Sequence, residues 1–346
     1  MYRRCNIKRN LTIKDVAKKA GVSVATVSRV LNSSTSVRRE TAKIVQDAIN
    51  ELEYIPNNIA TNLKTDQSHV IAFVVTDVKN SVLTYLISSI QNVLWDHNYF
   101  MMFFATNGDP DRETSILRFI AQQRVDGIIL NSCTNEKIVT KLSKQIPIVL
   151  TGNDITDPNF IGDFIDTDNH AATYMLTSHL ISQGHRNIGI INGPHNLDVS
   201  YERFCGYQSA LAVIGLNVIE SSPLVYQGNF DRISGFNAAK SLLSLTENRP
   251  TALLITNNEM MKGVLQYCLE NKINIPDDLS IVTIGNRCQL DLLYISPTYM
   301  ETNLEEIGER LARLLLERIE KDHKIPKRIL RVPAFFHNGT TVKPIV

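Results

Sequence analysis

Cysteine is scarce in this chain of 346 residues, and its five copies are scattered. No CxxC pair occurs among Cys5, Cys133, Cys205, Cys268 and Cys288, so their spacing indicates neither a disulfide framework nor a zinc site. We therefore expect reduced thiols in a cytoplasmic protein, with no metal and no cofactor.

Long apolar runs are also missing. No run approaches the roughly 20 apolar residues of a membrane-spanning helix. The basic start, MYRRCNIKRN, is not followed by the apolar stretch of a signal peptide. The expected protein is soluble and has no membrane partner.

The motifs of large enzyme classes are absent as well. We find no GxGxxG after a predicted strand, no P-loop, no GxSxG and no HExxH. The histidines are dispersed along the chain. We therefore expect no catalytic residues and no enzyme activity.

The net charge of the whole chain is close to zero, but the positive and negative residues are unevenly distributed along it. Residues 1–65 carry 12 Lys or Arg against 5 Asp or Glu, a net charge of +7. The whole chain is +1, so the remaining residues carry −6. A basic head on an acidic body is typical of a nucleic-acid-binding module joined to a domain with another task.

The basic head contains a helix-turn-helix pattern. Thr12 is placed to cap a first helix over 13–20, Gly21 supplies the break, and Ser23 is placed to cap a second helix over 24–31. A third helix is predicted over 39–52. The small core between the helices is predicted to hold Val16, Ala17, Ala20, Val22, Val27, Val30 and Leu31. A second helix presented in this way fits the DNA major groove.

From Val70 onward, short apolar runs alternate with helical stretches. The predicted strands are 70–75, 100–105, 127–130, 148–150, 188–191, 252–255 and 280–284. The predicted helices are 81–97, 112–123, 171–183, 203–214, 235–245 and 259–271. This alternation predicts parallel sheets covered by helices, and the length favours two α/β lobes.

Taken together, these motifs resemble those of the LacI/GalR family of bacterial transcription regulators. The resemblance is carried by 12–32, by 48–57 with Ala60 and Leu63, and in the body by 124–129, 184–189, 192–194 and Arg203 with Gly206 and Tyr207. It implies a small all-α helix-turn-helix head with a hinge helix. These would be joined to an α/β two-lobe body like the type I periplasmic binding proteins.

The resemblance also implies domain boundaries. We expect a DNA-binding domain over 1–55, a hinge helix and linker over 56–69, and an effector-binding and dimerisation domain over 70–346. Lobe 1 would take about 70–166 and 297–323, and lobe 2 about 168–295 and 327–341. The chain would cross between lobes near 166–169, 295–299 and 323–327.

The predicted partner of the head is double-stranded operator DNA. By the resemblance, Val24, Ala25 and Arg29 face base edges. Val24 and Ala25 can pack on thymine methyl groups, and Arg29 can hold a guanine through two hydrogen bonds. Phosphate contacts are expected from Ser23, Thr26, Ser28 and Asn32.

The hinge supplies the remaining predicted DNA contacts, from Asn57, Leu63 and Lys64. By the resemblance, Leu63 is a wedge that unstacks a central base step in the minor groove, and Lys64 can enter the same groove. A homodimer on a pseudo-palindromic operator is expected. The tetramer-forming relatives carry a C-terminal leucine heptad that this sequence lacks.

The effector site is predicted from Arg203, Asn257 and Arg287. Acidic residues of sugar-binding relatives are replaced here by Gly152, Asn258 and Arg287. Two arginines in the cleft would suit an anionic effector, such as a sugar phosphate or a sugar acid, rather than a neutral sugar. Alternatively, Arg287 turns outward or pairs with Asp291, or the pocket is degenerate and a protein co-regulator controls the regulator.

The overall expectation is a regulator of transcription, with repression as the family's usual mode. A sugar-binding transport protein would share the body fold. The missing export signal and the DNA-binding head both argue against that alternative.

Overall fold

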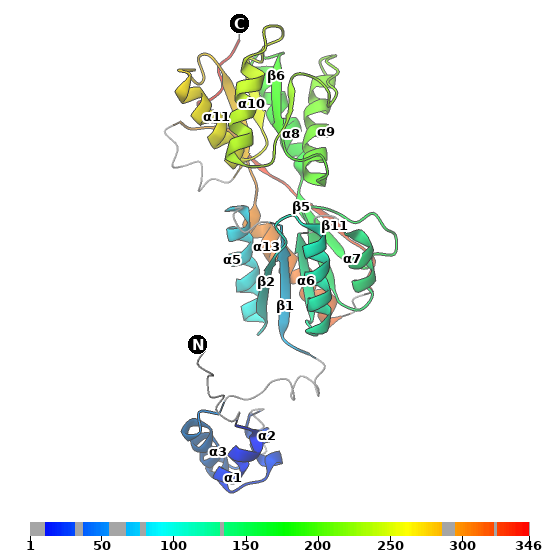
Figure 1. Cartoon of the computed structure of the whole chain (residues 1–346), viewed down its shortest axis with the longest axis vertical. Helices are drawn as coiled ribbons and strands as arrows, with labels where there is room; N and C mark the ends of the chain where they lie inside the picture. Colours follow the sequence, from blue (N-terminus) through cyan, green and yellow to red (C-terminus); the bar gives the residue numbers. More distant parts are fainter. Residues whose placement is uncertain are drawn as a thin grey trace, which may run out of the picture. The chain divides into compact units, whose positions relative to one another are not determined.

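The computed structural model describes residues 11–31, 37–54, 67–76, 81–131, 135–285, 295–321 and 324–345. The chain divides into two compact units, Met1–Gln67 and Ser68–Val346. The first unit is the helical head, and the second unit is the α/β body (Figure 1).

The head consists of α1 (Ile13–Ala20), α2 (Val24–Leu31) and α3 (Arg39–Glu51). The Asp15 carboxylate accepts hydrogen bonds from the backbone N–H and the hydroxyl of Thr12, both at 2.8 Å, and so holds the start of α1. Gly21 ends α1 with a left-handed φ of 66°, which costs glycine little because it has no Cβ. The predicted head core is confirmed, since Val16, Ala17 and Val27 are buried with the other predicted apolar residues against them.

The body contains two six-stranded sheets, and their strand ends carry the candidate effector site. Sheet A has the order β11-β5-β4-β3-β1-β2, with parallel neighbours throughout. Its strands are β1 (Val70–Val75), β2 (Phe100–Ala105), β3 (Gly127–Asn131), β4 (Ile148–Thr151), β5 (Asp163–Thr167) and β11 (Ile329–Val332).

Sheet B has the order β12-β10-β9-β8-β6-β7, and only β12 runs antiparallel to its neighbour. Its strands are β6 (Ile188–Asn192), β7 (Val225–Gln227), β8 (Ala252–Ile255), β9 (Ser280–Gly285), β10 (Thr298–Glu301) and β12 (Phe335–His337). All seven predicted strands are therefore present, and β5, β7, β10, β11 and β12 are additions to them.

Helices cover both faces of each sheet, as expected for parallel strands. Sheet A lies between α5 (Ser81–Asp96) with α13 (Leu304–Glu320) and α6 (Pro110–Gln122) with α7 (Glu136–Leu142). Sheet B lies between α8 (Asn169–Ser182) with α9 (Asp198–Ala212) and α10 (Arg232–Leu243) with α11 (Asn258–Glu270). We call sheet A with its helices lobe 1, and sheet B with its helices lobe 2.

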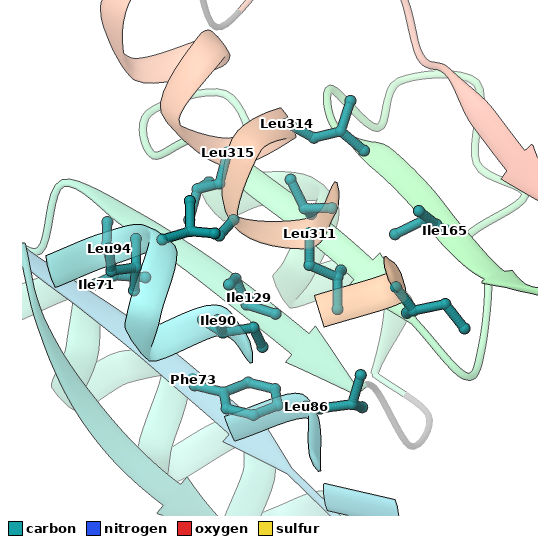
Figure 2. Packing of buried hydrophobic residues seen from close by; sticks show 14 of the residues in the cluster. Ile71, Phe73, Leu86, Ile90, Leu94, Ile129, Ile165, Leu311, Leu314 and Leu315 are labelled. Carbon is teal, nitrogen blue, oxygen red and sulfur yellow. The ribbon is translucent and has the colours of Figure 1, made fainter. Parts of the chain in front are cut away.

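The core of lobe 1 joins segments from both ends of the body. Figure 2 shows Leu311 and Leu315 of α13 above Ile129 of β3, next to Ile90 of α5. Ile90, Ile129, Leu311 and Leu315 are fully buried. Helix α13 therefore covers part of a sheet whose first strand lies more than 200 residues earlier in the sequence.

The chain passes between the lobes at three places, two of which differ from the prediction. The first crossing, at Asp168, lies within the predicted range 166–169. The second lies between β10 and α13, at 302–303, and the third between β11 and β12, at 333–334. The predicted crossings near 295–299 and 323–327 are therefore wrong.

Strand pairing explains both differences. Thr298 pairs with Val282 of β9, so β10 still belongs to lobe 2. Ile329 pairs with Phe164 of β5, so β11 belongs to lobe 1. The predicted lobe segments 297–323 and 327–341 become 304–332 for lobe 1 and 335–345 for lobe 2.

A buried ion cluster fastens α13 to sheet A. The Asp163 carboxylate at the start of β5 accepts from Arg318 Nε and Nη2 at 2.7 and 2.6 Å, and from Arg328 Nε and Nη2 at 3.1 and 2.8 Å. The side chains of Asp163 and Arg318 are both inaccessible to solvent. Arg328 also pairs with Glu317 of α13 at 2.7 Å.

Candidate DNA-reading and effector-binding sites

The start of α2 has the cap that the sequence predicts. The Ser23 hydroxyl accepts from the Thr26 backbone N–H at 3.1 Å, and the two hydroxyls lie 2.9 Å apart. This satisfies one of the N–H groups that the first helical turn leaves without a partner. Both hydroxyls remain at the helix end, where the sequence predicts phosphate contacts.

The two faces of α2 differ sharply in exposure. Val27 is fully buried in the head core, whereas Val24 is 40% exposed, and Ala25 and Arg29 are exposed. Thr26 and Ser28 are half-buried. An apolar residue at the first helical position that stays exposed is not needed for the head core and is available to another molecule.

Several predicted site residues lie outside the described residues. They are Asn32, Asn57, Leu63 and Lys64 for DNA and Arg287 for the effector. The predicted hinge helix beginning at Pro56 also lies there. Their roles therefore remain predictions.

In the body, Arg203 lies on α9 and is held in place by two neutral acceptors. Its Nε donates to Asn169 Oδ1 at 2.9 Å, and its Nη1 donates to the Thr256 carbonyl at 2.6 Å. Thr256 directly follows β8, and Asn169 is the first residue of α8. Arg203 is thus fixed near the carboxyl ends of the strands, where ligands of parallel sheets bind.

Two carboxyl groups and one ring adjoin Arg203, and sequence reasoning missed all three. Burial lowers the pKa of Arg203 to about 10, although the neighbouring Asp166 and Glu202 act to raise it. Burial likewise raises the pKa of the Asp166 carboxyl. The Phe230 ring lies 5.9 Å from Arg203 Cζ. Gly193 makes room for this ring, because a Cβ there would overlap it.

Asn257 has a clear part in the fold. Its Oδ1 accepts from the Met260 N–H at 2.9 Å and caps α11, while its Nδ2 donates to the Phe230 carbonyl at 2.9 Å. Asn257 therefore holds both the helix start and the segment that carries the ring. Its predicted contact with effector remains a prediction.

Lobe 1 contributes polar groups at its strand ends. Asn131, at the end of β3, accepts from the Thr76 hydroxyl at 3.0 Å and donates to the Thr151 carbonyl at 3.1 Å. A Cβ at Gly152, where φ is 86°, would meet the Asn131 amide. The missing acidic side chain at Gly152 thus leaves space that Asn131 occupies.

Comparison with known proteins matches each unit to a family model. Residues 12–57 match the model of bacterial regulatory proteins of the lacI family. Residues 68–340 match the model of periplasmic binding proteins and the sugar binding domain of the LacI family. The chain belongs to the LacI family. It is a DNA-binding transcriptional repressor with an effector-binding domain.

Curated relatives extend over nearly the whole chain. The transcriptional repressor PurR of Mannheimia succiniciproducens is 32% identical, with 92% of this chain and 94% of the relative covered. PurR of Vibrio campbellii is 30% identical, with 96% and 99% covered. These relatives are regulators of transcription.

Solved structures show the same fold. The lac repressor dimer bound to operator and the anti-inducer ONPF has a TM-score of 0.84 at 22% identity, with 97% of this chain and all of that chain covered. The complex of the regulator CelR with cellobiose has a TM-score of 0.71 at 25% identity, with 96% and 99% covered. Within the described part of the body and head, no helix is long and apolar enough to cross a bilayer.

Proposed function

We propose that this LacI-family repressor binds a pseudo-palindromic operator as a homodimer and reads each half-site with Val24, Ala25 and Arg29. The exposure pattern of α2 carries the proposal, because these three side chains are exposed while Val27 anchors the helix in the head core. Two apolar contacts and one guanidinium predict a site with thymine methyl groups and one essential guanine in each half.

Selection of bound DNA from a random pool tests this reading. The expected result is a palindrome with a guanine that Arg29→Ala no longer selects and a flexible step at its centre. Ser28→Ala is the matched control on the same helix, because a lost phosphate contact weakens binding without altering the selected bases. An unchanged preference in the Arg29 variant would show that Arg29 does not read a base.

We propose that the dimer forms through the β2 edge of lobe 1. Strand β2 is the last strand of sheet A, and Phe100 on it and Trp95 on α5 are 64% and 65% exposed. The two rings meet edge to face, with centroids 6.1 Å apart. An exposed aromatic patch along an unpaired sheet edge is typical of an association surface.

Sedimentation of the full chain tests this interface. Phe100→Glu is expected to shift the protein from dimer to monomer, because it would bury charge in an apolar contact. Val213→Glu, at an exposed apolar position after α9, is the matched control and should leave the dimer intact. Dimers that persist in the Phe100 variant at the same concentration would place the interface elsewhere.

We further propose that a small-molecule effector binds beside Arg203. The guanidinium, the Asp166 carboxyl and the Phe230 ring offer donors, acceptors and a flat apolar face. This set suits a ring-shaped molecule rich in hydroxyl groups. Because Asp166 and Glu202 offset the charge of Arg203, the geometry favours a neutral sugar here, whereas a sugar phosphate or sugar acid would depend on Arg287.

The CelR–cellobiose neighbour is consistent with a sugar effector. Thermal-shift screening of neutral sugars against their phosphates and acids is the test. A ligand of the proposed site should raise Tm in the native protein but not in Arg203→Met, and it should still act on Arg232→Met, an exposed control. A response to anionic compounds alone would contradict a neutral sugar and would favour an anionic effector bound by Arg203 and Arg287.

A further inference from the structure

The first two turns of α9 lie at the interface between the lobes and contact lobe 1. Asp198 is the first residue of α9, and Glu202 follows four residues later. Residues four apart lie on the same face of a helix, so one face carries both carboxylates. Each of them meets a different element of lobe 1.

Asp198 binds the loop that follows β4. Its Oδ2 accepts from the Asp154 N–H at 2.7 Å, and its own N–H donates to Asn153 Oδ1 at 3.1 Å. Lobe 1 holds this loop independently, because Lys327 Nζ lies 2.6 Å from Asp154 Oδ1 and donates to the Ile155 carbonyl at 2.7 Å. The loop therefore presents the Asp154 N–H to α9 from a fixed position.

Glu202 forms an ion pair with Arg331 of β11. Arg331 is held on lobe 1, with its Cζ 4.8 Å from the Phe164 ring. Glu202 also faces the carboxyl groups of Asp166 and Asp198 and the amide of Asn169. Burial raises the pKa of Glu202 to about 6, with the two carboxylates adding to the rise and Arg331 opposing it. Glu202 is thus mostly ionised at pH 7.5.

We propose that the pairs Glu202–Arg331 and Asp198–Asp154 act together as an interlobe clasp that sets how readily the two lobes separate. The clasp consists of the chain's own groups, so it acts whichever effector binds. Arg203, the next residue on α9, contacts Asn169 and Thr256 of lobe 2. The clasp and the candidate effector site therefore share one turn of α9, so a shift of that turn at one of them is expected to alter the other.

Amide hydrogen exchange of the full chain at pH 7.5 tests the clasp without DNA or effector, so its outcome is independent of the proposed operator and effector. The reporter is the Asp154 N–H, which neither Glu202 nor Arg331 touches. Glu202→Gln and Arg331→Met are each expected to lower its protection roughly fivefold, as loss of a partly buried ion pair would. The double variant should lower it no further, because either single change already removes the pair.

Two controls separate the clasp from general destabilisation. Glu259→Gln removes an ion pair of similar exposure within α11 and should leave Asp154 protected. The Met260 N–H, bonded to Asn257 within lobe 2, should keep its protection in every variant. The clasp is overturned if Asp154 protection is unchanged in both single variants, or if Met260 protection falls equally with it.

Discussion

Replacing Asp163 by asparagine should destabilise lobe 1 far more than any surface charge change. The substitution leaves the Arg318 guanidinium buried without its counter-charge, and it replaces one of the two carboxylate oxygens that accept from Arg318 and Arg328 with an NH2 group that cannot accept. Arg318 retains hydrogen bonds to the carbonyls of Gly162 and Ile325 at 3.1 and 3.0 Å, but neither supplies negative charge. Breaking a buried pair from one side costs about 3–5 kcal/mol.

Urea unfolding is the assay, followed by circular dichroism and by the fluorescence of Trp95, the single tryptophan, on α5 of lobe 1. A loss of about 3–5 kcal/mol is a large part of the roughly 5–15 kcal/mol of a typical domain. Asp277→Asn, which breaks an exposed pair with Lys343, should leave stability nearly unchanged because solvent screens that pair. A cost below about 1 kcal/mol for the Asp163 variant would refute the reasoning.

The same cluster predicts an acid dependence. Burial acts to raise the pKa of Asp163, but the hydrogen bonds from Arg318 and Arg328 outweigh it and hold the pKa below its usual range. The folded state therefore binds the proton less readily than the unfolded chain does. The stabilisation is present above the unfolded pKa and is lost as pH falls toward the folded pKa. The Asp163 variant should show a flatter loss of stability in acid.

Three further predictions follow from the caps, the recognition helix and Glu202. Ser23→Ala should destabilise the head by about 1 kcal/mol, seen as faster exchange of the Thr26 N–H, whereas unchanged exchange would show that the cap contributes nothing. Arg29→Lys keeps the charge but loses the paired geometry, so affinity for the preferred guanine should fall by about 1–3 kcal/mol while non-specific binding and its salt dependence stay the same. Burial raises the pKa of Glu202 in the folded protein to about 6, above its ordinary value, so stability is lost as pH rises from that ordinary value to about 6. The difference in unfolding free energy between Glu202→Gln and native protein should therefore shift in favour of the variant by up to about 2 kcal/mol between pH 4 and pH 8. A difference that does not change with pH would contradict this.

Local signals predicted the head well. Both ends of α1 and the start of α2 follow from Thr12, Gly21 and Ser23, whose effects act within one helical turn. The body strands were predictable where they are continuously apolar, as in Val70–Val75. Strand β5 was not, because Asp163 reads as a loop residue until its partner Arg318, 155 positions away, is known. Lobe membership failed for the same reason, since β10 and β11 join their sheets through pairing that no local pattern specifies.

The candidate effector site likewise contains residues that the sequence predicts and residues that only the folded structure brings together. Arg203 was predicted from its motif, whereas Asp166 and Phe230 come near it only through the packing of β5 and of the segment before α10. The sequence feature that relates to Phe230 is the glycine at position 193, whose lack of a side chain makes room for the ring. That relation links residues far apart in sequence and cannot be inferred from either one alone.

The late position of α13 and β11 in the chain has a consequence for synthesis. A nascent chain that has emerged only as far as Glu301 holds nearly all of sheet B. It lacks α13, one of the two helices that cover one face of sheet A, and β11, the strand that pairs with the β5 edge. Until Glu320 emerges, the apolar face over Ile71, Phe73 and Ile129 lacks α13, and such a surface favours aggregation. Lobe 2 can therefore approach its final form on the ribosome before lobe 1, although lobe 1 begins first. A premature stop before Leu304 is expected to give a product that chaperones and proteases remove rather than a shortened repressor.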